Sequence, residues 1–125
     1  SVSFGGNAGN LGTEGISYDP RNGGSFVTVK QGSPQAVLAG GLNFATGAST
    51  MSALFNPTLL GLASLSDVQT LASVDALAGT AAADHLLILS LESQRLVEVN
   101  RSGQVLSSLD LSGLTQQAYP YRQAS

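Results

Sequence analysis

The sequence predicts an all-β protein built from two four-stranded antiparallel sheets, with short helical turns in the connections. Three observations predict this fold. The 125 residues include 15 glycines and only 10% charged residues, a composition that favours strands joined by many turns. Short runs of alternating apolar and polar residues are bounded by turn residues. Two sets of such runs follow each other along the chain, which indicates an internal repeat.

The first set of strands is expected within residues 13–47, after a Gly- and Asn-rich segment at 1–12 that we interpret as a loop with a short strand. Ile16 and Tyr18 share one face of the first strand, and the turn residues 19–24 end it. Three more strands, which would complete the sheet, are predicted at 26–30, 36–39 and 42–44.

Residues 48–64 are predicted to be a connector, because the strand alternation stops after Thr46. Asn56 followed by Pro57 is typical of a helix N-cap with proline at the first helical position. We therefore expect one short helical turn there, with leucines on its apolar side.

The second set of strands is expected within residues 65–112, and residues 113–125 are interpreted as the start of a third set or as a divergent tail. The Ala-rich stretch 72–83 predicts a loop that carries one helical turn. The four predicted strands are 65–71, 84–90, 95–100 and 104–111.

Aligning the two sets suggests a repeat with an offset of 52 or 53 residues for the first strands and about 59 for the second strands. A period near 50 residues made of four short strands predicts a β-propeller blade, because a single sheet of this size must stack on neighbours to bury its faces. Two blades do not close a ring. We therefore expect a β-propeller fragment, completed by the remaining blades of a longer chain or by further copies.

The charge distribution argues against nucleic acid as a partner, because the net charge is −3 and the chain has no basic run. Arg21, Lys30 and Arg95 stand singly in the sequence, which argues against a phosphate-binding cluster. No apolar stretch approaches the length of about 20 residues that a membrane span needs. Without cysteine, disulfides and thiolate sites are excluded.

A further signal lies in segments 13–20, 25–30, 65–68, 85–90 and 95–106. Together they resemble the SdiA-regulated family of β-propellers, which is related to esterase-like phytase domains. Similar motifs occur more loosely in NHL-type propellers. The resemblance implies a six-bladed propeller, usually in exported or cell-envelope bacterial proteins, with bound calcium in some members and no single established reaction. Residues 119–125 depart from the pattern that the family would continue.

Glu14 and Asp67 are candidate metal ligands, because both open the first strand of a predicted blade. Inner strands of a propeller end at the central channel, where two carboxylates could share a calcium ion through oxygen ligands. The alternative is that each side chain caps a turn or accepts hydrogen bonds from nearby backbone N–H groups.

His85 is the only histidine and is a candidate general base or metal ligand. Because the chain has no cysteine and no Gly-x-Ser-x-Gly nucleophile elbow, we interpret His85 as a residue at the start of a strand.

The function favoured is non-catalytic binding or scaffolding in an exported bacterial protein, with an unidentified small molecule or envelope partner and with calcium as the candidate cofactor. The alternatives are an esterase- or phytase-like hydrolase whose site is completed by missing blades, and a self-assembling lectin-like propeller.

Overall fold

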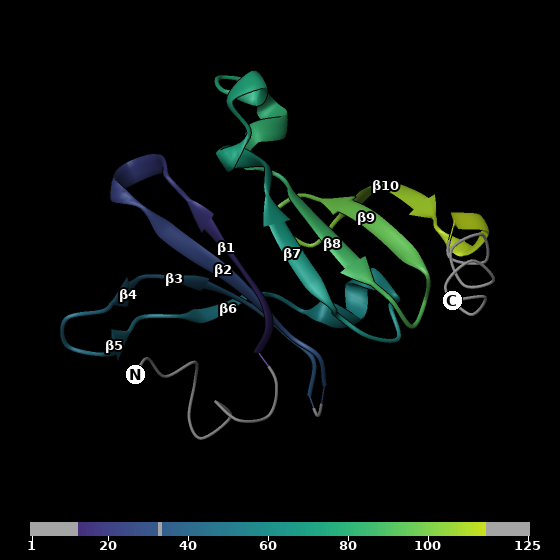
Figure 1. The fold of residues 1–125 in the computed structure, drawn as a ribbon, viewed down its shortest axis with the longest axis horizontal. Helices are drawn as coiled ribbons and strands as arrows, with labels where there is room; N and C mark the ends of the chain where they lie inside the picture. Colours follow the sequence, from purple (N-terminus) through teal and green to yellow (C-terminus); the bar gives the residue numbers. More distant parts are fainter. Residues whose placement is uncertain (1–12, 33, 115–125) are drawn as a thin grey trace, which may run out of the picture.

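The computed structural model describes residues 13–32 and 34–114. Within them, the chain forms two four-stranded antiparallel sheets, so the predicted all-β architecture is confirmed (Figure 1). The strand order is β1-β2-β3-β6 in the first sheet and β10-β9-β8-β7 in the second. The strands are β1 Thr13–Asp19, β2 Ser25–Lys30, β3 Ala36–Gly40, β6 Ser52–Phe55, β7 Asp67–Thr70, β8 Leu86–Ser90, β9 Arg95–Val99 and β10 Val105–Asp110.

The prediction of the fourth strand of the first sheet at 42–44 is wrong. The third strand runs on through Gly40 into β4 (Leu42–Asn43), which pairs with β5 (Ala48–Ser49) in a two-stranded ribbon that extends away from the sheet (Figure 1). The chain reverses only at Gly47, which has a φ of 75° and whose N–H donates to the Asn43 carbonyl. The fourth strand is therefore β6, inside the range that was assigned to a connector.

The helical turns of the connections are all short 3-10 turns. The predicted turn after Asn56 is confirmed as η3 (Pro57–Leu60), in which the Asn56 side chain accepts a hydrogen bond from the Thr58 N–H at 3.0 Å. The Ala-rich stretch carries three turns rather than the one predicted, and another lies between β1 and β2. These four are η2 Arg21–Gly23, η4 Leu71–Ser73, η5 Asp75–Leu77 and η6 Ala81–Asp84.

The core lies between the two sheets. Because side chains alternate across a strand, Val27 and Val29 of β2 point to the same face, as do Leu86 and Ile88 of β8, and all four are fully buried. Leu60 of η3 and Leu62 after it belong to the same buried cluster, so the connector contributes to the core. The buried cluster consists of Val27, Val29, Val37, Leu60, Leu62, Leu65, Val68, Leu86, Ile88, Val97 and Val99.

The strands β1 and β7 are the neighbouring edges of the two sheets (Figure 1). Gly15 lies against the backbone of Asp67, and Ser17 is hydrogen-bonded to Thr70, so the two strands run parallel. These contacts join residues 52 or 53 positions apart, as the repeat predicted. Two antiparallel sheets with adjacent parallel inner strands are the arrangement of neighbouring propeller blades.

The leading segment 1–12 and most of the predicted tail lie outside the described residues. Within the described part of the chain, no helix has both the length and the apolar character needed to cross a bilayer.

Candidate functional site

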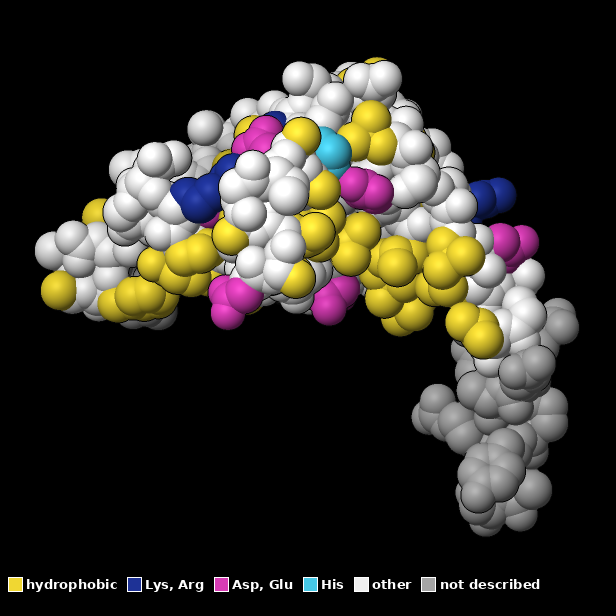
Figure 2. Space-filling model, turned by 90° about the horizontal axis from the view of Figure 1, so that it is seen from above, with side chains coloured by type: hydrophobic (Ala, Val, Ile, Leu, Met, Phe, Trp, Pro, Cys, Tyr) yellow, Lys and Arg dark blue, Asp and Glu magenta, His cyan; other side chains and the backbone are white. Residues whose placement is uncertain are grey.

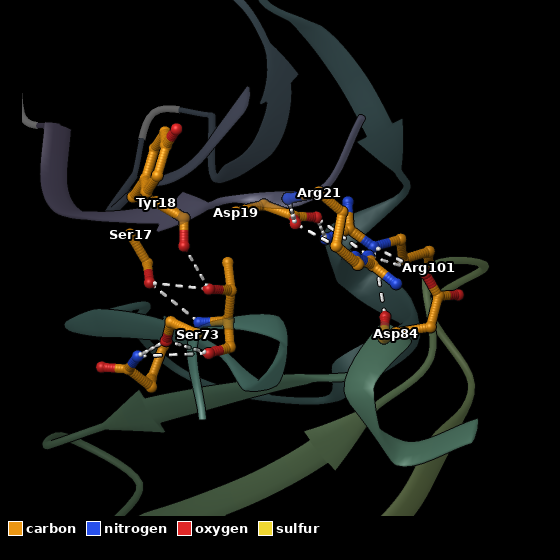
Figure 3. Close-up of polar contacts among 9 residues, drawn as sticks. Ser17, Tyr18, Asp19, Arg21, Ser73, Asp84 and Arg101 are labelled. Carbon is orange, nitrogen blue, oxygen red and sulfur yellow. Dashed lines mark hydrogen bonds and ion pairs between the residues drawn. The ribbon is translucent and has the colours of Figure 1, made fainter. Parts of the chain in front are cut away.

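Four charged side chains meet where the loops of the two sheets come together (Figure 3). Asp19, at the end of β1, accepts hydrogen bonds from Arg21 Nη2 and from Arg101 Nη2, each at 2.9 Å. Asp84, at the end of η6, accepts a hydrogen bond from Arg21 Nη2 at 3.0 Å. Arg101 Nε also donates to the Asp84 backbone carbonyl at 3.1 Å. This charged cluster therefore ties the first sheet to two separate segments of the second.

The local sequence sets each of these side chains in place. Pro20 follows Asp19 and adopts the αR conformation, so the chain turns back and the Arg21 N–H donates to Asp19 Oδ1 at 3.0 Å. Arg101 lies in a turn in which Asn100 Oδ1 accepts hydrogen bonds from the backbone N–H groups of Ser102 and Gln104. Both turns use an Asx side chain to fix the backbone that carries the arginine.

The charges in this cluster compensate one another. The side-chain hydrogen bond from Arg21 lowers the pKa of Asp19 below its usual range, and the nearby charge of Arg101 adds to this. The same bond to Asp19 raises the pKa of Arg21. The Asp19 side chain is only 5% exposed, and two carboxylates face two guanidinium groups. The arrangement acts as an ionic clamp between the sheets.

A second polar contact joins the inner strands directly (Figure 3). The Thr70 N–H donates to Ser17 Oγ at 2.8 Å, and Thr70 Oγ1 donates to the Tyr18 carbonyl at 2.6 Å. Ser17 and Thr70 are both buried. Since buried polar groups are costly unless they are paired, this contact fixes the register of β7 against β1.

Replacing Thr70 by valine is expected to lower the free energy of unfolding by about 1–2 kcal/mol, because the Tyr18 carbonyl loses its buried donor while the shape of the side chain is kept. Urea unfolding followed by circular dichroism measures the change. Thr80 is the matched control, since its hydroxyl donates at the same 2.6 Å to the Leu77 carbonyl, but in an exposed local turn. An equal loss in Thr80→Val would contradict the inter-sheet role of Thr70.

The candidate metal ligands Glu14 and Asp67 are both exposed and lie on the adjacent inner strands. In the alignment of Glu14-Gly15-Ile16 with Ser66-Asp67-Val68, Asp67 occupies the position of Gly15 rather than that of Glu14. Asp67 Oδ1 accepts a hydrogen bond from the Val68 N–H at 2.8 Å. In the described residues, no group of three or more His, Cys, Asp or Glu side chains could hold a metal ion. Calcium binding by this pair stays a prediction.

His85 lies between η6 and β8, directly before the strand. Its Nδ1 is 2.7 Å from Glu98 Oε2, and Ser107 Oγ donates to the other oxygen of Glu98 at 3.0 Å. Both bonds lower the pKa of Glu98, that from His85 more than that from Ser107. The carboxylate stands between the imidazole and the hydroxyl, so the histidine is not positioned to take a proton from this serine.

Sequence reasoning did not identify the charged cluster. The Asp-Pro-Arg order at 19–21 indicates a capped turn, and that signal predicts the bond within the first sheet. Arg101 lies 82 residues from Asp19, and no spacing rule connects residues so far apart. Arg21 stands singly in the sequence, and its second carboxylate partner, Asp84, lies 63 residues away in η6, just before the second strand of the other sheet.

The family model described as SdiA-regulated matches residues 1–120 of the chain. No curated protein matches it.

Proposed function

The chain belongs to the SdiA-regulated family, and from this membership and the paired sheets we propose that it serves as a non-catalytic binding or scaffolding module of an exported bacterial protein. The observation that carries the proposal is that the charged side chains at the meeting point of the two sheets are paired with one another. The four side chains of the charged cluster pair with one another across the sheets, and His85 is held by Glu98. The charged cluster holds the two sheets together as one unit, and the His85–Glu98 pair lies within the second sheet.

A scaffold needs its two sheets to behave as one rigid body. The shared core supports this, since residues of both sheets and of the connector contribute to a single buried cluster. The ionic clamp and the Ser17–Thr70 contact add polar links at the inner edge. We propose that partners bind to surfaces outside this interface. The export of the protein is proposed from its family membership alone.

Purified chain is expected to unfold in one transition that coincides in far-ultraviolet circular dichroism and tyrosine fluorescence, as a single cooperative unit does. It is also expected to hydrolyse neither p-nitrophenyl acetate nor p-nitrophenyl phosphate above the buffer rate, with or without calcium. His85→Ala is the matched control, since it removes the only imidazole. Turnover in the wild type that is lost in His85→Ala would overturn the proposal in favour of a hydrolase.

A further inference from the structure

We infer that copies of this chain associate head to tail, the outer face of the second sheet of one copy packing on the outer face of the first sheet of the next. The outer face is the side of each sheet that points away from the shared core. In Figure 2, exposed hydrophobic side chains form two areas, one toward each end of the described part of the molecule. The first outer face carries Ile16, Tyr18, Phe26, Leu38 and Phe44, and the second carries Leu87, Leu89, Leu96 and Leu109.

The first outer face is apolar and aromatic. Ile16 and Tyr18 are each 48% exposed. The Tyr18 ring packs on Phe26 with centroids 5.1 Å apart, and Phe26 contacts Phe44 edge to face at 6.0 Å. Aromatic side chains with one exposed face contribute strongly to the free energy of binding when a partner surface buries that face.

The second outer face is a leucine-lined hollow on the far side of β8 and β9. Leu87, Leu89 and Leu96 line it, with Asp67 and Gln69 of β7 at one side. A second hollow continues toward β10 and includes Leu109. The surface is thus apolar at its centre and polar along the inner strand, which is the usual pattern of an interface.

The contact between the two sheets provides the template for this association. In the repeat, Glu14-Gly15-Ile16 aligns with Ser66-Asp67-Val68, so Ile16 corresponds to Val68. Their strand partners, Thr28 and Ile88, correspond in turn. The outer face of the first sheet therefore corresponds to the buried face of the second. By the same pairing, Leu87 corresponds to Val27, so the outer face of the second sheet corresponds to the buried face of the first. Both halves of the internal interface are present again, on the two outer faces.

Charge favours the head-to-tail arrangement over pairing of like faces. Lys30, at the end of β2, lies on the same side of its strand as Thr28 and Phe26. The second outer face carries the carboxylates of Asp67 and Glu98. Two copies that joined through their second faces would bring these carboxylates together, whereas head-to-tail packing sets them against a face that carries a lysine.

The contact between two copies would differ in one respect from the contact between the two sheets of one chain. Gly15 lets β1 approach the backbone of β7 closely, and Asp67 occupies the corresponding position in the second sheet. The inner strands of two copies therefore cannot approach as closely as β1 and β7 do. The association is expected to be weaker than the contact within the chain and to depend on concentration. Because the two faces differ, each added copy leaves one free face at each end, and growth stops only if a ring closes.

The test is the oligomeric state of the full chain, measured by sedimentation velocity and light scattering over a range of concentrations. The wild type is expected to exceed the monomer mass as concentration rises. Ile16→Glu removes the first face and Leu96→Glu removes the second, so each variant alone is expected to be monomeric. Mixed together, the two variants retain one intact face of each kind and are expected to form a 1:1 dimer that grows no further.

Leu59→Glu is the matched control, because Leu59 is 59% exposed but lies in η3, outside both faces, and it should assemble as the wild type does. Circular dichroism and melting curves establish that each variant is folded, and a misfolded variant is replaced by Tyr18→Glu or Leu109→Glu on the same face. A monomeric wild type, single variants that still assemble, or a mixture that stays monomeric would each overturn the inference.

Discussion

Replacing Gly15 by alanine is expected to lower the free energy of unfolding by about 3 kcal/mol, at the upper end of the usual cost of overpacking. A Cβ at this position would lie 2.8 Å from Asp67 Cα and 3.0 Å from the Val68 nitrogen. These are backbone atoms of the neighbouring inner strand, and they cannot rotate away as a side chain can. The two sheets would have to separate at their inner edge, which exposes part of the core. Urea unfolding measures the change.

Gly32→Ala is the matched control, since a Cβ there meets nothing within 4 Å. We expect it to leave the stability unchanged or to raise it by a few tenths of a kcal/mol through the unfolded chain. If Gly15→Ala is no more destabilising than Gly32→Ala, the close approach of β1 and β7 does not restrict the size of the side chain at position 15.

Replacing Asp19 by alanine is expected to lower the free energy of unfolding by about 3 kcal/mol, because it leaves two partly buried guanidinium groups without their shared carboxylate. The Asp19 side chain is 5% exposed and pairs with Arg21 and Arg101 at 2.9 Å each. Asp84→Ala is the control within the same cluster, since its side chain is 55% exposed, and we expect a cost below about 1 kcal/mol. Equal losses in the two variants would show that burial of Asp19 is not what makes the clamp strong.

The clamp also predicts how stability depends on pH. Because folding lowers the pKa of Asp19, its contribution is fully present above the unfolded value of about 3.9 and is lost as the pH falls through the folded pKa. Asp19→Asn lacks this titration. The stability advantage of the wild type over Asp19→Asn should therefore be constant near neutral pH and shrink below about pH 4. An advantage that grows on acidification would contradict the assigned ion pairs.

The strands of the second sheet could be predicted from the sequence because each is a short run of strand-favouring residues bounded by turn or loop residues. The repeat offset of the first strands was predictable for a similar reason, since Glu14-Gly15-Ile16 and Ser66-Asp67-Val68 begin comparable runs. The fourth strand of the first sheet was not predictable. Leu42 and Asn43 are strand residues as the alternation indicates, but only pairing with β5 shows that they prolong the third strand rather than start another.

By itself, the sequence determined most of the strands, the position of most turns and the presence of a repeat, because strand propensity and turn chemistry act between residues close along the chain. The tertiary structure decided what holds the sheets together. Asp19 meets Arg101, Gly15 meets the backbone of Asp67, and Ser17 meets Thr70. Each of these contacts joins residues more than 50 positions apart, and it forms only once both sheets have folded and packed on a common core.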